Sequence, residues 1–304
     1  MSVLLLAVAL DLAVGDPPNR FHPVAWIGRL IATGRRFAER CPSRGLTLYG
    51  GALVIVVTAA AGAASFAADA AAGWLPWPLD LLARAWLLKC AFSLRGLVAA
   101  VWQVRDALVA GDVAAARSAL GTHLVSRPVE SLDHGAAASA AIESLSENLT
   151  DSWVAPLCFY LVGGVPAAWA YRAVNTADAM IGYRQGILER LGAASARLDD
   201  VLNFLPARLA ALALVAGAWL AGESASGAWQ TWHRDAHLTE SPNAGRTMAA
   251  TAGALGVALE KPAHYRVGRG ALPDGPVIDR AVRVVAAAIG VTLAAALVVL
   301  RIVR

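Results

Sequence analysis

Residues 46–72 read LTLYGGALVIVVTAAAGAASFAADAAA, and Asp69 is the sole charged side chain in this stretch. A helix needs about 20 apolar residues to cross the roughly 30 Å hydrocarbon core of a bilayer. The stretch exceeds that length, so it predicts a membrane-spanning helix.

Two further stretches resemble spans. The residues from Leu205 to Gly222 are apolar but shorter, and Arg208 stands at their entrance. The residues from Ala281 to Val303 form a stronger candidate, because charges flank both ends as expected for a helix anchored at two interfaces. The flanking charges are Arg280, Arg283, Arg301 and Arg304.

Other segments are ambiguous. The segment from Leu79 to Ala110 has helical periodicity but carries recurrent basic residues, so it predicts a surface helix or a tilted helix whose cations face a polar cavity. The segment from Trp153 to Tyr171 contains Gly163, Gly164 and Pro166, which predict a kink or a re-entrant helix. Between apolar stretches, Trp74-Leu75-Pro76-Trp77-Pro78 is a turn suited to the membrane interface.

Composition agrees with a membrane fold. Of 304 residues, 58% are hydrophobic and 16% are charged, against about 25% charged in soluble domains. We therefore predict an all-α, polytopic membrane protein with about four to six membrane-associated helices, built as a single domain over residues 1–304. The start, residues 1–14, lacks a basic leader and is expected to remain as a helix.

The formal net charge is +4 and comes almost wholly from arginine. Six arginines follow the first apolar stretch, which predicts that their loop faces the cytoplasm under the positive-inside rule. They are Arg20, Arg29, Arg35, Arg36, Arg40 and Arg44. No basic stripe with interleaved aromatics indicates nucleic-acid binding, and Cys41, Cys90 and Cys158 lack the spacing of a disulfide framework or zinc site.

The polar segments are roughly residues 15–45, 111–152, 172–204 and 223–280. If they share one face of the membrane, they can build a single site at its cytoplasmic edge. The densest motif runs from Glu143 to Asp151. Glu143, Glu147 and Asp151 are spaced by four and would stack along one helix face. Such a row is either a solvated acidic surface or a cation site, and Mg²⁺ binds carboxylate and phosphate oxygens.

Two similar motifs follow. In the first, Arg172 and Arg184 flank Asn175 and Asp178, and arginine is suited to a bidentate grip on phosphate or carboxylate. In the second, Asp199, Asp200 and Asn203 precede Pro206. For Asn175 and Asp199, a helix N-cap role is the alternative.

Two loops complete the set. Asp16 and His22 stand in a proline-rich loop (GDPPNRFHPV, 15–24) whose prolines hold it rigid. Asn243 and Arg246 follow the turn at Ser241-Pro242. The chain has no GxSxG elbow, Walker A loop or HExxH motif.

Taken in order, these motifs resemble the CobD/CbiB family of cobalamin biosynthesis, the membrane-bound adenosylcobinamide-phosphate synthases. The stretches that carry the resemblance are GDPPNRFHPV (15–24), ESLSENLTDSWVAPLCFY (143–160), YRAVNTADAMIGYR (171–184), ARLDDVLNFLPARL (196–209) and SPNAGRTMAATAGALGV (241–257). Where the family usually reads NTLDSM, this chain reads NTADAM, which leaves Asn175 and Asp178 intact.

The resemblance implies ATP-dependent amide ligation of aminopropanol, free or phosphorylated, to the one unamidated propionate of adenosylcobyric acid. It implies ATP and Mg²⁺, an inner-membrane location with the site facing the cytoplasm, and contact with other membrane enzymes of late cobalamin assembly. Catalytic roles are predicted for Glu143, Glu147, Asp178, Asp199 and Asp200. Substrate or phosphate binding is predicted for Asp16, His22, Asn148, Arg172, Asn175, Arg184, Asn203, Asn243 and Arg246, and Mg²⁺ ligation for Glu147, Asp151, Asp178 and Asp200.

Three other functions fit parts of the pattern. Acidic and asparagine motifs at membrane-helix ends also bind Mg-diphosphate in intramembrane prenyltransferases. A transporter would line a path with ionisable residues, although here the polar groups gather outside the cleanest spans. A scaffold that tethers other enzymes would need no chemistry at all.

Overall fold

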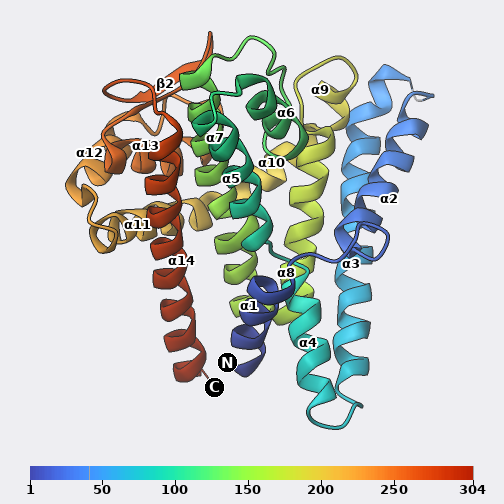
Figure 1. The fold of residues 1–304 in the computed structure, drawn as a ribbon. Helices are drawn as coiled ribbons and strands as arrows, with labels where there is room; N and C mark the ends of the chain where they lie inside the picture. The colour runs from blue at the N-terminus through green and yellow to red at the C-terminus, as the bar shows by residue number, and fades with distance from the viewer. Residues whose placement is uncertain (41, 304) are drawn as a thin grey trace. The chain divides into compact units, whose positions relative to one another are not determined.

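The protein is described by a computed structural model that covers residues 1–40 and 42–303, and its regular structure is almost entirely helical (Figure 1). This confirms the prediction of an all-α fold. The expectations about Cys41 and Arg304 lie outside the described residues. The sequence did not predict the antiparallel hairpin of β1 (Ala258–Lys261) and β2 (Tyr265–Gly268), in which Ala258 pairs with Gly268.

The chain divides into two compact units, each assembled from segments that are distant in sequence. The first unit comprises Met1–Ser93, Ala155–Asn203 and the residues from Val299 onward. Its helices are α1 (Ser2–Val14), α2 (Pro23–Ala38), a 3₁₀ turn (Ser43–Gly45), α3 (Leu46–Ala72), α4 (Leu79–Lys89), α8 (Ala155–Ile181), α9 (Leu188–Leu191) and α10 (Ala193–Leu202).

The second unit comprises Leu94–Val154 and Phe204–Val298. Besides the hairpin it contains α5 (Arg95–Val109), α6 (Val113–His123), α7 (His134–Leu149), a π-helical turn (Thr150–Val154), α11 (Phe204–Leu220), α12 (Ala225–Asp235), α13 (Ala244–Leu255) and α14 (Gly275–Val303). The expectation of one domain over the whole chain stays a prediction.

Three described helical segments are long and apolar enough to cross a membrane: Ser43–Ala72, His134–Ile181 and Gly275–Val303. A fourth span exists if α10 and α11 together make one bent crossing. The molecule is therefore a polytopic helical membrane protein, as its composition predicts.

Two ambiguous segments are resolved by their backbone. The segment from Leu79 to Ala110 is not one helix, because α4 ends at Lys89 and α5 begins at Arg95. Within α8, Gly164 has φ 68° and ψ −157°, a conformation open mainly to glycine. Pro166 follows and lacks a backbone N–H. The predicted kink is confirmed.

In the first unit, α3 packs along α8, and α1 packs on α4 (Figure 1). The turn between α3 and α4 exposes 89% of Trp74 and 80% of Trp77, as expected for tryptophans at a membrane interface. In the second unit, α13 lies against α7, α11 and α12. The run from Ala137 to Ser146 in α7 is fully buried and forms the core of that unit.

Candidate functional site

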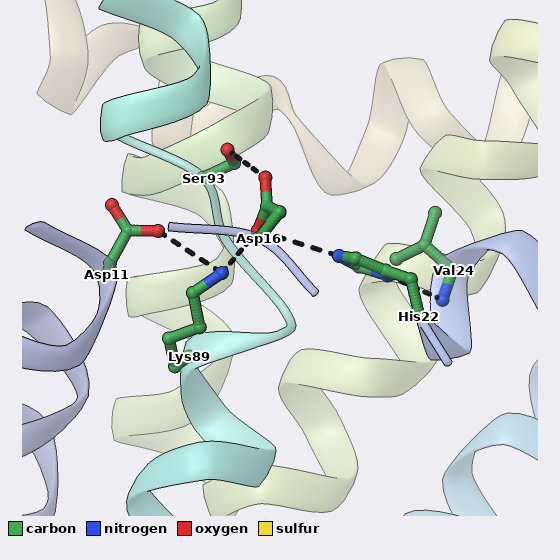
Figure 2. A network of polar contacts seen from close by, with 6 residues as sticks. All are labelled: Asp11, Asp16, His22, Val24, Lys89 and Ser93. Carbon is green, nitrogen blue, oxygen red and sulfur yellow. Dashed lines mark hydrogen bonds and ion pairs between the residues drawn. The ribbon is translucent and has the colours of Figure 1, made fainter. Parts of the chain in front are cut away.

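The loop after α1 is held by a buried lysine (Figure 2). The Lys89 side chain is 0% exposed, forms an ion pair with Asp16, and lies 3.4 Å from Asp11 Oδ1. Ser93 Oγ donates to Asp16 Oδ2 at 2.6 Å. Burial alone would raise the pKa of Asp16, but hydrogen bonds from His22, Lys89 and Ser93, together with the Lys89 charge, hold that pKa below its usual range. Asp16 is therefore a carboxylate fixed in place.

His22 joins this network and starts α2. Its Nδ1 accepts the backbone N–H of Val24 at 3.1 Å, while Nε2 lies 3.6 Å from Asp16 Oδ1. With Nδ1 accepting, a neutral ring carries its proton on Nε2, facing the carboxylate. Both ring nitrogens are thus engaged, so His22 orients the loop and caps the helix. The structure confirms that Asp16 and His22 lie together.

A cleft of about 490 Å³ opens beside this network. Arg20, Arg29 and Arg172 line it, together with Asp16 and His22. The three guanidinium groups outnumber the Asp16 carboxylate that lines the cleft, so the cleft carries a net positive charge. Such an arrangement favours phosphate or carboxylate, which arginine binds through paired N–H donors.

Arg172 connects the cleft to a second network of hydrogen-bonded side chains in the same unit. Its Nη1 donates to Asn175 Oδ1 at 3.2 Å, and Asn175 Nδ2 donates to Asp199 Oδ1 at 3.3 Å. Asn203 Nδ2 donates to Asp199 Oδ2 at 2.9 Å, and the Tyr171 hydroxyl donates to Asn203 Oδ1 at 2.9 Å. Asn175 and Asp199 lie within α8 and α10, so the N-cap interpretation of both is wrong.

Asp178 and Asp200 lie near Asp199, and the three carboxylates repel one another electrostatically. Within residues 1–40 and 42–303, however, no three His, Cys, Asp or Glu side chains are grouped to hold a metal ion. Mg²⁺ commonly binds through one or two carboxylates plus substrate phosphates and water. The predicted Mg²⁺ ligands therefore stay a prediction, in which a substrate phosphate completes the site.

The acidic motif of α7 lies in the second unit, and its members have different surroundings. Glu143 is 4% exposed. It accepts Ser139 Oγ at 2.7 Å and the Tyr265 hydroxyl at 2.6 Å, and Arg127 Nη2 lies 3.7 Å away. Burial and the charge of Glu143 raise the pKa of Tyr265 well above its usual range, so the phenol stays a donor. Glu143 thus ties the hairpin to α7.

The continuous acidic face predicted for this motif is not observed. Glu147 is exposed and lines a polar cavity of about 200 Å³ with Glu240, Lys261 and His264. Asp151 falls in the π-helical turn after α7, which interrupts the regular four-residue spacing. Asn148 donates to the Ser144 carbonyl at 2.9 Å, so its amide is engaged within the helix.

The other predicted residues are dispersed. Asn243 is buried at the start of α13, and Arg246 donates from Nε to the Pro242 carbonyl at 3.1 Å. Arg184 is exposed in the loop after α8. Asp16, His22, Arg172, Asn175, Asp178, Asp199, Asp200 and Asn203 belong to the first unit, whereas Glu143, Glu147, Asn148, Asp151, Asn243 and Arg246 belong to the second.

Sequence reasoning missed several participants. Lys89 appeared only as one of several cations in a helical segment, although it is one of two lysines in the chain, and that rarity was a usable signal. Arg20 and Arg29 were assigned to topology alone. Tyr265 lies in the hairpin, more than a hundred residues from its partner Glu143, and no local pattern marks that contact.

Comparison with known proteins bears on this arrangement. Residues 4–297 match the family described as CobD/Cbib protein. A cobalamin biosynthesis protein CobD from Dehalococcoides mccartyi is 41% identical over 271 residues, covering 88% of this chain and 86% of the relative. A cobalamin biosynthesis protein CbiB from Salmonella typhimurium is 37% identical over 273 residues, covering 87% and 84%. No solved structure matches the chain. Its role is in cobalamin biosynthesis, and the chain belongs to the CobD/CbiB family.

Proposed function

We propose that this protein joins the amine of (R)-1-amino-2-propanol, or of its O-phosphate, to the free propionate carboxylate of adenosylcobyric acid, with ATP supplying the driving force. One observation carries the proposal. Arg20, Arg29 and Arg172 converge on one cleft, and Arg172 links that cleft to the Asp199 network. A cluster of cationic side chains and an acidic, amide-lined region thus lie within one unit, which supports the proposal.

The chemistry requires activation, because a carboxylate does not react with an amine at a useful rate. In the proposed first step, a propionate oxygen attacks the γ-phosphorus of ATP and ADP leaves. In the second, the amine nitrogen attacks the acyl carbon, inorganic phosphate departs, and the nitrogen loses a proton. The products are one amide, ADP and phosphate.

The described residues divide this work. The cleft arginines bind phosphoryl oxygens and neutralise the charge that develops during transfer. A volume of about 490 Å³ suits a phosphorylated amino alcohol or the phosphates of ATP, and is too small for a whole corrinoid. Mg²⁺ that arrives with ATP would supply further charge neutralisation.

Asp199 is proposed as a positioning residue, because both of its carboxylate oxygens accept amide N–H groups. Asp178 and Asp200 are the proposed acceptors of the amine proton. The repulsion among the three carboxylates favours an arriving ammonium group, since a nearby cation relieves it. The site is proposed to face the cytoplasm at the inner membrane, where ATP and the corrinoid are both in water.

The test is a ligation assay with purified protein in lipid nanodiscs, supplied with adenosylcobyric acid, ATP, Mg²⁺ and either acceptor. Mass spectrometry identifies the product. We expect Arg29→Ala to lower kcat/KM by roughly tenfold or more, the loss of about 1.5–3 kcal/mol from one charged hydrogen bond. Arg36→Ala is the matched control, an exposed arginine two turns further along the same helix.

The choice of acceptor sharpens the result. If the cleft binds the acceptor's phosphate, Arg29→Ala raises KM for aminopropanol phosphate far more than for aminopropanol. If it binds ATP, both acceptors suffer equally. Absence of any amide product would reject the ligase proposal, and a prenylated product with an allylic diphosphate would favour the transferase alternative. Equal losses in the two arginine variants would remove the cleft from the site.

A further inference from the structure

Helix α11 exposes a continuous apolar stripe. Leu205, Leu209, Leu212 and Trp219 recur at helical spacing and are 60%, 38%, 45% and 73% exposed. The opposite face, which includes Leu214, is buried. With 17 residues and a rise of about 1.5 Å per residue, α11 is about 25 Å long. That length is at the lower limit for crossing the roughly 30 Å hydrocarbon core, so the direction of the helix decides whether it spans.

The direction of α11 is set by where it meets α14. A Cβ atom at Gly217 would lie 2.6 Å from the Val284 carbonyl oxygen and 2.8 Å from the Ala288 nitrogen. The two backbones therefore touch at this point, and α11 runs across α14 instead of along it (Figure 1). The turn after α11 is fixed nearby, because Arg280 donates to both oxygens of Glu223 at 2.8 and 2.5 Å.

The crossing coincides with a change in the character of α14. Asp279, Arg280 and Arg283 all precede it, whereas the residues from Val284 to Leu300 carry no charge. Those uncharged residues extend about 25 Å along the axis at the standard helical rise. This part of α14 is the hydrocarbon-crossing part, so the crossing point lies where the polar region meets the acyl chains.

The positions of the neighbouring helices are consistent with α11 lying at the boundary between the polar region and the acyl chains. Helices α12 and α13 lie on the side of α11 away from the C-terminal half of α14 (Figure 1). Trp219 at the end of α11 and Trp229 in α12 are 73% and 45% exposed, and tryptophan concentrates at bilayer interfaces. The exposed tryptophans and the crossing point on α14 therefore indicate the same membrane level for α11.

We infer that α11 is an interfacial helix that lies in the plane of the membrane, with its stripe (Leu205, Leu209, Leu212 and Trp219) seated on lipid. It is not a transmembrane span. Helix α11 lies between the lipid and the helices α12 and α13. The surface that it contacts is the headgroup–acyl boundary of the bilayer.

The experiment measures depth along the helix. The variants Leu205→Cys, Leu209→Cys and Leu212→Cys would each carry a nitroxide label. Each is made in the full chain with its native cysteines replaced and is reconstituted in bilayers. Electron paramagnetic resonance with oxygen and a water-soluble nickel complex then gives the depth of each label. Matched labels at Ala286, Ala294 and Val298, exposed on α14, calibrate a helix that does cross.

We expect the α11 labels to share one shallow depth, about 5–10 Å into the boundary region. Between Ala286 and Ala294 the depth should change by about 12 Å, following the helical rise. Depth that increases along α11 toward the bilayer centre would show a span and overturn the inference. Free access of nickel to every α11 label would show an aqueous surface, and exclusion of both reagents would show burial by a second copy or another protein. Either result would also overturn it.

Discussion

At the scale of single residues, a few charged side chains of the first unit are fully buried. Lys89 is the clearest case, since its side chain is fully buried between Asp11 and Asp16. Removing one partner from a buried ion pair leaves an uncompensated charge, which costs far more than the pair contributes. The lysine is therefore expected to be necessary for the fold of the first unit.

We predict that Lys89→Met lowers the free energy of unfolding by about 3–5 kcal/mol, measured by thermal or denaturant unfolding in detergent with near-ultraviolet circular dichroism. Lys261→Met is the control, because it changes the other lysine, a half-buried residue at the end of β1. Its effect should stay within about 0.5 kcal/mol. Equal effects would contradict a special role for Lys89.

The same pair predicts a pH dependence. The folded pKa of Asp16 is depressed, so its stabilising contribution is present above the unfolded pKa of about 4. It is lost as the pH falls through the folded value. The unfolding midpoint of the parent should drop on acidification below about pH 4, and the drop should be shallower in Lys89→Met.

Many of these polar residues could be recognised from the sequence, but their contacts could not. Asp16, His22, Arg172, Asn175, Asp199 and Asn203 were all recognised, because short polar motifs stand out against an apolar chain. Their connections were not recognised. Which amide bonds Asp199, and which lysine neutralises Asp16, depend on contacts between α8 and α10 or between α1 and α4, and no local spacing encodes them.

At the scale of elements, composition identified which segments are helices, but not how each helix is oriented relative to the membrane. Helix α11 has the apolar content of a span, and its place beside α14 at Gly217 determines its course. Glycine is needed there because the backbone of α14 is in contact. A side chain would force the helices apart.

We predict that Gly217→Ala lowers the free energy of unfolding by about 1–3 kcal/mol, the usual cost of overpacking. The Cβ would meet Val284 and Ala288 backbone atoms that cannot move aside cheaply. Gly290→Ala is the matched control in α14, since nothing lies within 4 Å of its Cβ position. That change should be neutral or stabilising by up to about 1 kcal/mol. A neutral Gly217→Ala would show that the helices are not in close contact.

Breaks in helices could be predicted only where local residues cause them. The predicted break in α8 was correct because Gly163, Gly164 and Pro166 act locally on the backbone. The π-helical turn at Thr150–Val154 was missed because its residues include no glycine or proline that would mark it. The hairpin contact of Tyr265 was missed because Glu143 lies more than a hundred residues away.

At the scale of the whole molecule, the arginine-rich loop before α3 (Arg35 to Arg44) and the tryptophan turn after it (Trp74 to Pro78) lie at the two ends of that helix. Helix α3 runs from one to the other, so they should lie on opposite sides of the bilayer. The order of five motifs along the chain predicted the family, because that pattern spans nearly all of the sequence, and the long apolar stretches predicted the membrane fold. The number of crossings was not recoverable, since apolar helices can cross, bend or lie flat.

We predict that Leu75→Cys reacts with a membrane-impermeant maleimide added outside intact cells or spheroplasts. Ser43→Cys should react only after permeabilisation, because arginine-rich loops stay in the cytoplasm. Both changes are made in a chain whose native cysteines are replaced, and mass-tagged electrophoresis gives the labelled fraction. The reverse pattern would place the arginine-rich loop outside the cytoplasm and contradict the predicted orientation.

The Asp11–Lys89 pair also constrains how the chain is made. Helix α1 leaves the ribosome with its aspartate roughly 80 residues before the lysine appears, an interval of about 4–16 s at ordinary rates of synthesis. During that time the carboxylate has no lysine beside it, and an anion is costly in the bilayer core. The first helix should therefore wait at the membrane surface, or inside the insertion machinery, and dock only when α4 arrives.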